Sequence, residues 1–391
     1  MAFDLKKVAF VVGVSLTVII VVCSVQYVFT VRWKQQSNDV VEPGRFSDPS
    51  LKFVAILFRH GNRAPEFKCN TDPHKNTFPE GKLELTKKGK QNMYKKGQIF
   101  RRLYNGFLSD LYLESEILVK TTNTSRTFMS AAMVLAGMYP PKGYQKWSNS
   151  ETVWQPIPIY GDSPDHGTLF NERGKCPAFD SMVIKLRNES DNLTDKNITA
   201  LMSYLSEKCG QPITHKNIMK LYDLLICRKA DGLPQLEWIE PYHIETIKPI
   251  VINEQSSKRF FENYGFQKIV IGPLLNEIGL SMESSSNNYN GTRKMHLYSG
   301  HDISVEMAMS FLGNTINLPD FGASLHFHLY HHDEMNEHTI KMFYYDRWDN
   351  EEGKEVSIPI CGNPCTFKDF KNLLEKNFSE EWAEECQKLE S

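Results

Sequence analysis

Short apolar segments that suit β-strands alternate along the chain with longer segments whose apolar residues recur at helical spacing. The first short segment, Leu51–Phe58, is rich in β-compatible residues, which predicts a strand buried on both faces. Further strands are expected at Ile117–Lys120, at Trp154–Ile159 and in KMHLYSGHD, where the strand stops at His301. Because strands that alternate with helices form layered α/β folds, the pattern predicts an α/β sandwich with a mainly parallel sheet.

The segments between these strands carry the helical pattern. Thr86 can cap a helix that runs to about Leu108, and apolar and small residues form one stripe along it. Similar patterns follow the second strand and occur in KIVIGPLLNEIGLSM and ISVEMAMSFLG. From about 161 to 261 the chain changes to Pro-bearing loops and helical runs, which predicts an inserted, mostly helical lobe.

Two segments near the C-terminus, SLHFHLY and TIKMFYYD, alternate with period two around a polar seven-residue stretch and predict an antiparallel hairpin. The alternation places His326 and His328 on one strand face, and three more histidines, at 331, 332 and 338, lie in the connecting hairpin. A metal site is one interpretation of these histidines. A half-exposed strand with a polar turn is the favoured one.

The N-terminal region differs from the rest of the chain. Residues 8–31 are 24 positions without a charge, preceded by Lys6 and Lys7, and this length is enough for a membrane-spanning helix. The alternative is a signal peptide cut near Ser24. Because the apolar run continues beyond such a cut, an uncleaved signal-anchor is favoured. Residues 1–7 would then be a cytoplasmic N-terminus, and the polar residues 32–50 a stalk.

Charge, sequons and cysteines restrict the partners and the compartment. Lysines and arginines number 45 against 47 acidic residues, so there is no basic excess that would indicate nucleic acid. The glycosylation sequons lie at Asn123, Asn188, Asn192, Asn197, Asn290 and Asn377. Seven cysteines follow the apolar segment, and the short CGNPC loop suits a local disulfide better than a zinc site. The chain beyond the segment is therefore expected to face the lumen or the outside.

Polar residues of related chemistry follow three of the predicted strands. These are Arg59, His60 and Arg63 after the first, Arg126 after the second, and His301 and Asp302 after the strand at 297–299. In open α/β sheets, ligands bind beyond the carboxyl ends of the strands. Three arginines suit a phosphate group, because the guanidinium fork matches its oxygens. A neutral His60 can attack phosphorus and Asp302 can supply a proton to the leaving group, which predicts a phosphoryl-transfer site.

Two motifs make this prediction specific. RHGNRAP, at 59–65, resembles the R-H-G-x-R-x-P signature of the histidine acid phosphatases, and SGHD, at 299–302, resembles their second His-Asp motif. The resemblance covers 51–390 and includes LTKKGKQNMYKKGQIFRRLY, TSRTFMSA and FGASLHFHLY. It implies a phosphoglycerate-mutase-like fold, with a mixed sheet flanked by helices and an inserted, mostly α-helical cap lobe. Within the family, the prostatic, lysosomal and insect venom acid phosphatases are the most similar group.

Roles for individual residues follow from the resemblance. It implies that His60 is the nucleophile and Asp302 the proton donor, and that neither a metal nor another cofactor takes part. The residues that would bind the substrate phosphate are Arg59, Arg63, Arg126 and His301. The sequon at Asn123 lies three residues before Arg126, so we expect it to be unglycosylated.

The resemblance also implies two disulfide bonds, Cys176–Cys386 and Cys361–Cys365. A third, local pair is expected between Cys209 and Cys227 in the helical lobe. Cys69 would then be left alone.

The expected function is that of an acid phosphatase acting on phosphate monoesters, either small molecules or phosphoproteins, through a phosphohistidine. One alternative is an inositol-polyphosphate phosphatase, which needs additional Lys and Arg residues around the pocket. Another is an inactive secreted binding protein, which the presence of His60 and Asp302 disfavours. The protein is expected in the secretory pathway, as a single-pass membrane protein with a lumenal or extracellular catalytic domain, or secreted or lysosomal if the N-terminus is cleaved. A homodimer is expected only by analogy.

Overall fold

The computed structural model describes residues 43–74, 77–149, 152–161, 176–188, 196–214, 217–255, 263–287, 289, 291–316, 318–377 and 382–387. The chain divides into two units between Gly44 and Arg45, and the fold belongs to the second. The predicted cytoplasmic residues 1–7, the signal-anchor at 8–31 and most of the predicted stalk lie outside the described residues. Within the described ranges, no helix has the length and apolar character needed to cross a membrane.

The centre of the fold is a mixed sheet whose strand order is β3-β2-β4-β1-β5-β6-β7, with β8 paired to β6. The strands are β1 (Leu51–Arg59), β2 (Ile117–Thr121), β3 (Tyr160–Gly161), β4 (Met295–Gly300), β5 (Ser324–His332), β6 (Glu337–Tyr345), β7 (Lys354–Val356) and β8 (Cys365–Thr366). The first four strands pair in parallel, whereas β5 to β8 add antiparallel pairs. This confirms the mixed sheet that the resemblance implies. The mainly parallel sheet expected from the strand–helix alternation is wrong for the C-terminal half, where hairpin connections replace helical crossovers.

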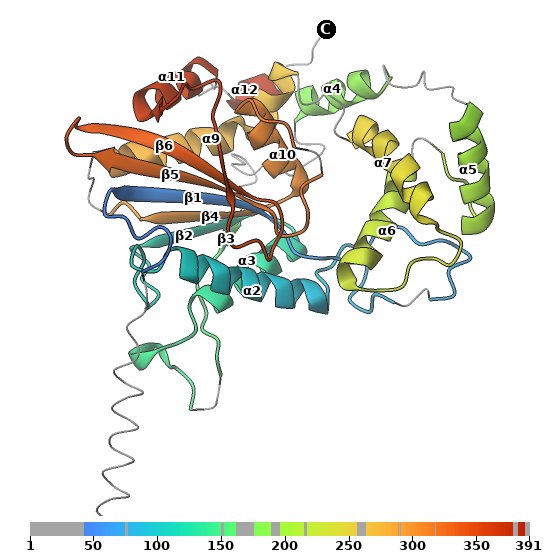
Figure 1. The fold of residues 1–391 in the computed structure, drawn as a ribbon, viewed down its shortest axis with the longest axis horizontal. Coiled ribbons are helices and arrows are strands. Elements are labelled where there is room, and N and C mark those ends of the chain that lie inside the picture. The colour runs from blue at the N-terminus through green and yellow to red at the C-terminus, as the bar shows by residue number, and fades with distance from the viewer. Residues whose placement is uncertain are drawn as a thin grey trace, which may run out of the picture. The chain divides into compact units, whose positions relative to one another are not determined.

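Helices cover both faces of the sheet (Figure 1). The helices are α2 (Lys87–Leu103), α3 (Ser125–Met138), α4 (Pro177–Asn188), α5 (Lys196–Cys209), α6 (Ile218–Asp231), α7 (Pro241–Gln255), α9 (Tyr264–Ser286), α10 (Asp302–Phe311), α11 (Phe367–Asn377) and α12 (Trp382–Gln387), with a 3₁₀ turn at Gly143–Gln145. In Figure 1, α2 and α3 lie below the sheet, and α9 and α10 lie above it. The Thr86 side chain accepts a hydrogen bond from the Gly89 N–H, which confirms the predicted cap. The helix ends at Leu103 rather than near Leu108, because the chain turns at Gly106 with φ +89°.

Alternate residues of β1 enter two different cores. Phe53, Ala55 and Leu57 pack with residues of α9 and α10. Val54, Ile56 and Phe58 pack with residues of α2 and α3. All six side chains are fully buried, as expected for a strand covered on both faces. This double cover holds β1 rigidly, and the signature residues follow directly from its C-terminal end.

The helical segment between β3 and α9 divides between two cores. Helix α4 contributes Ala178, Phe179 and Met182 to the core that also contains α9 and α10. Helices α5, α6 and α7 share a separate core with Cys69. We call α5, α6 and α7 the cap. Because the cap has its own apolar core, it is a packed subdomain rather than an extended loop.

Two expectations for strands differ from the structure. The strand expected at Trp154–Ile159 is wrong: these residues form no strand, and the short strand β3 follows them at Tyr160–Gly161, where it pairs with Lys120 and Thr121 at the end of β2. The predicted hairpin is present as β5 and β6, but the half-exposed character expected for β5 is wrong at His326 and His328, which are fully buried. Their imidazole rings are satisfied internally, because the Tyr104 hydroxyl lies 2.6 Å from His326 Nδ1 and 2.8 Å from His328 Nε2. A buried polar partner at the C-terminal cap of α2 therefore replaces solvent.

Among the described residues there are three disulfides, of which two connect distant parts of the chain and one closes a short loop. Cys176–Cys386 and Cys361–Cys365 are both present, as expected. The third bond joins Cys69 to Cys209, and Cys227 is a free, buried cysteine. The expected Cys209–Cys227 pair is therefore wrong. The cause is the packing of the segment after the signature loop, because Asn70 donates a backbone hydrogen bond to the Cys209 carbonyl and brings Cys69 beside the end of α5.

Candidate active site

The polar residues predicted from the strand ends meet at one edge of the sheet. Arg59 at the end of β1 is paired with Gly300 at the end of β4, and Thr121 at the end of β2 is paired with Ser299. The His60 N–H then donates to the Gly300 carbonyl at 3.0 Å. Parallel pairing thus brings three chain segments, far apart in sequence, to the same edge.

Close backbone packing fixes the loop that follows β1. The Gly61 N–H donates to Ser130 Oγ at 3.0 Å. A Cβ atom at Gly61 would lie 2.6 Å from Met93 Cγ, and one at Gly89 would lie 2.1 Å from the Asn62 carbonyl oxygen. Only glycine permits both approaches, so the start of α2 and the loop form one rigid unit.

His60 is a buried, neutral imidazole with a defined tautomer. Its Nδ1 atom lies 2.8 Å from the Gly61 carbonyl oxygen, which can only accept a hydrogen bond, so Nδ1 carries the proton. Nε2 therefore keeps its lone pair. Burial, followed by the positive charge of Arg59, lowers the pKa of His60 well below its usual value. The ring therefore stays neutral in mildly acidic solution.

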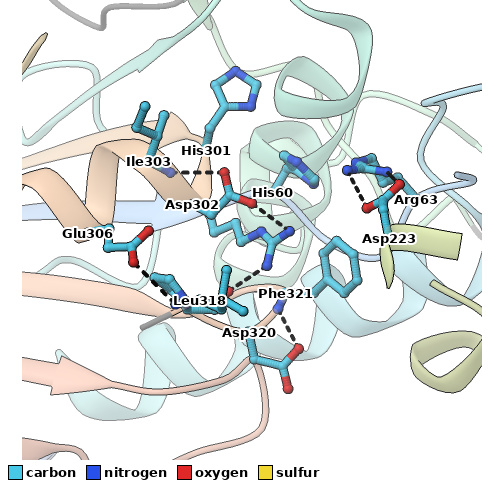
Figure 2. A network of polar contacts seen from close by, with 12 residues as sticks. His60, Arg63, Asp223, His301, Asp302, Ile303, Glu306, Leu318, Asp320 and Phe321 are labelled. Atoms are coloured by element: carbon cyan, nitrogen blue, oxygen red, sulfur yellow. Dashed lines mark hydrogen bonds and ion pairs between the residues drawn. The ribbon is translucent and has the colours of Figure 1, made fainter. Parts of the chain in front are cut away.

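Arg59 directly precedes His60 and is held from several directions by residues that include Asp302 and Phe321, both labelled in Figure 2. Its Nη2 atom is 2.9 Å from Asp302 Oδ2, and Nη1 donates to the Pro319 carbonyl at 2.5 Å. The guanidinium also lies over the Phe321 ring, with 4.2 Å between Cζ and the ring centroid. These contacts leave the guanidinium little freedom to reorient.

Arg126 and His301 form a second pair. Arg126 Nη2 donates to His301 Nδ1 at 3.3 Å, and the opposite ring nitrogen, Nε2, lies 3.0 Å from Thr122 Oγ1. Since Arg126 can only donate, Nδ1 is the acceptor and Nε2 carries the proton. Burial and then Arg126 lower the pKa of His301 to about 4. The His301 ring lies 5.6 Å from the His60 ring between centroids.

Asp302 begins α10 and faces the arginines. Its Oδ1 atom accepts the Ile303 N–H at 2.9 Å, and its Oδ2 atom binds Arg59. Burial alone would raise the pKa of this carboxyl group, but Arg59, His301 and Arg63 outweigh burial, and the net pKa lies below the usual value. Without a ligand, Asp302 is therefore a carboxylate.

Arg63 is bound by the cap. Its Nη2 and Nη1 atoms lie 2.9 Å and 3.0 Å from the two carboxylate oxygens of Asp223 on α6. Burial alone would lower the pKa of Arg63, but the ion pair and hydrogen bonds to Asp223 raise it. Figure 2 shows this pair beside His60, on the side opposite Asp302.

In each of the three arginines of the site, one nitrogen atom has no hydrogen-bond partner among the described residues. Among the described residues, the Nε atoms of Arg59, Arg63 and Arg126 are buried and lack a hydrogen-bond acceptor. A buried, unsatisfied donor is costly, and three such donors on cationic groups in one site fit an anionic ligand that accepts several hydrogen bonds. Phosphate has the charge and the number of oxygens to do so.

A family model describing the histidine phosphatase superfamily, branch 2, matches residues 50–345, which include both motifs at the strand ends. The chain belongs to this superfamily. Curated relatives agree with this assignment. The chain is 32% identical over 353 residues to a lysosomal acid phosphatase from Xenopus laevis, with 86% of this chain and 79% of the relative covered. It is 30% identical over 363 residues to a prostatic acid phosphatase from Mus musculus, with 88% and 91% covered.

Solved structures support the same fold. A phytase from Citrobacter braakii superposes with a TM-score of 0.66 at 16% identity, covering 86% of this chain and 99% of that one. A multiple inositol polyphosphate phosphatase from Bifidobacterium longum gives a TM-score of 0.52 at 12% identity, covering 88% and 96%. At these identities the likeness concerns the fold alone. It confirms that this branch 2 histidine phosphatase has the phosphoglycerate-mutase-like architecture expected from its motifs.

The structure brings all six predicted site residues of this histidine phosphatase together, and adds contacts that its motifs do not indicate. Asp223 lies within a helical run that the sequence marks only as part of the inserted lobe. Glu306 Oε1 accepts the N–H of Leu318, whose φ of +51° is uncommon for a residue with a side chain, and this places Pro319 and Phe321 against Arg59. The sequence contains a weak signal for the role of Asp223, because Asp223, Cys227 and Asp231 share one face of the predicted helix.

Proposed function

We propose that the protein is an acid phosphatase that hydrolyses phosphate monoesters through a phosphohistidine on His60. The observation that carries the proposal is the set of three unsatisfied arginine Nε donors around a neutral imidazole with its Nε2 lone pair free. The acid phosphatase relatives, which cover most of the chain, support the same activity. Small phosphomonoesters and phosphoproteins are both proposed as substrates.

In the first step, His60 Nε2 attacks phosphorus while the bond from phosphorus to the leaving oxygen breaks. The guanidinium groups of Arg59, Arg63 and Arg126 stabilise the charge on the non-bridging oxygens. Protonated Asp302 transfers its proton to the departing alkoxide. The products of this step are an alcohol and a phosphoryl group on His60.

In the second step, water attacks the phosphorus and the bond between phosphorus and Nε2 breaks. The Asp302 carboxylate accepts the proton that the water loses, and inorganic phosphate leaves. His60 returns to its neutral form and Asp302 to its acid form, so the cycle balances. His301 accepts a hydrogen bond from Arg126 through Nδ1. We propose that His301 also contacts the phosphate, and that its hydrogen bond with Arg126 changes when the anion binds.

Asp302 must acquire a proton although its pKa is lowered in the free protein. A bound phosphate group opposes the field of Arg59 and adds negative charge near the carboxylate, and both effects raise its pKa. A lower pH of the solution further increases the fraction of Asp302 that is protonated. The same conditions leave His60 neutral, because burial and Arg59 lower its pKa. Because a protonated Asp302 and a neutral His60 occur together at acid pH, this site would transfer phosphoryl groups at acid pH.

The decisive experiment is hydrolysis of p-nitrophenyl phosphate from pH 4 to 7, followed by an alkaline quench and mass mapping of the phosphorylated peptide. Phosphate is expected on His60 and is expected to be absent in His60→Ala, together with activity. Phosphate on a serine or aspartate, or undiminished turnover by His60→Ala, would overturn the mechanism. Activity that needs a divalent cation after chelation would do the same.

The alternative of an inositol-polyphosphate phosphatase receives less support. Solved phytases resemble the chain in fold, at identities that carry no substrate argument. The charged cap residues that contact the signature loop are acidic, since Asp223 binds Arg63 and Asp231 accepts from Asn62 at 3.2 Å. Carboxylates in this position favour simple monoesters over highly charged polyphosphates. Hydrolysis of inositol hexakisphosphate faster than p-nitrophenyl phosphate would reverse this preference.

We further propose that the catalytic unit works in the secretory pathway, facing the lumen or the outside, with 8–31 as its membrane anchor. Three disulfides are typical of that compartment, and several relatives are lysosomal acid phosphatases. Alkaline carbonate extraction of cell membranes, with N-terminal sequencing of the mature protein, tests the anchor. Soluble protein whose sequence begins near residue 25, or further along the chain, would show cleavage instead.

A homodimer is proposed at the β3 edge of the sheet. Large apolar side chains are exposed in β3 and in the segment before it: Trp147 is 60% exposed, Trp154 is 44% exposed and Tyr160 is 48% exposed. Trp147 donates its indole N–H to the Trp154 backbone carbonyl at 2.8 Å, which orients the Trp147 side chain, and the two indole rings meet edge to face with 6.5 Å between their centroids. Ordered aromatic surfaces beside an edge strand suit a second copy of the chain. Light scattering should give a dimer that Trp154→Glu converts to monomer, and a monomeric wild type would refute the proposal.

A further inference from the structure

Helix α6 presents one polar face to the signature loop. Asp223, Cys227 and Asp231 are spaced by four residues, so they lie on the same side of the helix. Asp223 binds Arg63 through both oxygens, and Cys227 Sγ lies 3.6 Å from Arg63 Nη1. Asp231 Oδ1 accepts hydrogen bonds from Asn62 and from Thr86. The helix is therefore joined to two successive residues of the loop.

The Asn62 contacts set the position of α6 along the loop. Asn62 Nδ2 donates to the Ala230 carbonyl at 2.8 Å as well as to Asp231, and Asn62 Oδ1 accepts from Asn92 of α2 at 3.2 Å. Asn62 thus links the C-terminal end of α6 to α2. With that end fixed, Asp223 lies two helical turns away, opposite Arg63.

The Arg63–Asp223 pair has the geometry of a fixed support. The two parallel hydrogen bonds hold the planar guanidinium in one orientation, and the side chains are only 13% and 27% exposed. Both Nη atoms are directed to the cap, and Nη1 also lies 3.3 Å from the Ala64 carbonyl. Nε, on the other side, is the buried atom without an acceptor. The carboxylate thereby decides which edge of Arg63 remains for a ligand.

The Asp223 carboxylate also compensates the positive charge of Arg63. Arg63 lowers the pKa of Arg126, after the larger effect of burial, so the two guanidinium groups oppose each other electrostatically. Asp223 offsets the charge of Arg63 as Asp302 offsets that of Arg59. Three arginines can therefore stay close together before any phosphate arrives.

We propose that Asp223 is a positioning residue for phosphoryl transfer: it aims the Nε edge of Arg63 at the phosphate and keeps the arginine cluster together. The inference rests on the proposed phosphatase function. Asp223 acts through Arg63 and does not touch the substrate. Its effect should consequently disappear when the Arg63 guanidinium is absent.

A double-mutant cycle tests this dependence. Asp223→Ala, Arg63→Ala and the double variant are compared with wild type by kcat and KM for p-nitrophenyl phosphate, and by the inhibition constant of inorganic phosphate. Asp223→Ala should lose roughly 10- to 100-fold in kcat/KM, as expected for a misplaced transition-state contact. In the Arg63→Ala background, the same change should cost less than roughly two-fold, because the group being positioned is already missing.

Two further variants keep the test decisive. Asp223→Asn preserves the volume of the side chain and removes its charge, so it should lose activity in the same direction even if Asp223→Ala folds poorly. Glu245→Ala, at an exposed acidic residue of α7, controls for general effects of removing a negative charge from the cap.

Equal losses from Asp223→Ala in both backgrounds, or a fully active Asp223→Asn, would overturn the proposal. A wild-type protein without phosphatase activity would instead refute the proposed function. Losses that follow only the melting temperature would show Asp223 to be a structural residue of the cap.

Discussion

Arg59 Nη2 lies 2.9 Å from Asp302 Oδ2, so a proposed phosphate-binding cation and the proposed proton donor form an ion pair before substrate binds. The pair joins the end of β1 to the start of α10, through residues 243 positions apart in the sequence. It keeps Asp302 ionised in the free protein. Binding of an anion to Arg59 is therefore coupled to protonation of Asp302.

This coupling predicts how Asp302→Asn behaves. The amide still accepts the Ile303 N–H and can cap α10, so the variant should fold and bind inorganic phosphate. Because it supplies no proton, the phosphorylation step should slow by roughly 100-fold or more for an alkyl phosphate. With p-nitrophenyl phosphate, whose leaving group needs little assistance, that step should slow much less. Rapid-quench measurements on both substrates separate the cases, and equal losses would leave Asp302 as a cap only.

Arg126→Lys tests whether the planar fork matters beyond its charge. Lysine keeps one positive charge but loses Nε, the atom that lacks a partner in the free site. We expect turnover to fall roughly 100-fold, as for loss of a transition-state donor. Arg101→Lys is the matched control, because Arg101 hydrogen-bonds the Ser109, Tyr104 and Leu108 carbonyls and should affect stability instead. Similar kinetics in the two lysine variants would exclude Arg126 from the phosphate site.

Buried histidines should make the fold less stable in acid. Burial is the main cause that lowers the pKa of His296 to about 4 and of His328 to about 3. The unfolded chain binds these protons near pH 6.5, so stability is complete above that pH and declines as the pH falls toward the folded values. For His296 alone the difference is about 3 kcal/mol at pH 4. Melting temperatures should fall from pH 6.5 to pH 4, and less steeply in His296→Gln. An unchanged slope in that variant would contradict the assignment.

Cys69–Cys209 should be the disulfide on which the cap depends. It closes a separation of 140 residues, whereas Cys361–Cys365 closes a separation of 4. Loop-closure entropy grows with loop length, so replacing both cysteines of the long bridge by alanine should cost up to about 5 kcal/mol. Limited proteolysis should then cut first within 196–255. The equivalent change at Cys361 and Cys365 is the control, and equal sensitivity of both variants would refute the entropic argument.

Most residues of the candidate site could be predicted from the strand ends and the two motifs. Arg59, His60 and Asp302 follow short apolar runs directly, and parallel strands end at one edge, so their meeting could be predicted. Asp223 could not, because its role depends on how α6 packs on the signature loop, and a carboxylate on an amphipathic helix is usually a solvated residue. The partner of Cys69 could not be predicted for a related reason. Nearby cysteines in sequence suggest a local bond, whereas tertiary packing placed Cys69 beside the end of α5.

The buried Cys227 thiol gives this protein an intrinsic reporter of cap opening. Its sulfur lies beside the Arg63–Asp223 pair, and burial raises its pKa, so a thiol reagent reaches it only after α6 separates from the loop. The alkylation rate at this position therefore measures the free energy of a local opening event rather than the reactivity of the sulfur. Inorganic phosphate that binds the Nε edge of Arg63, while Asp223 keeps both Nη atoms, would stabilise the closed arrangement and slow that rate. Motion of the cap and occupancy of the arginines can therefore both be read from this one cysteine.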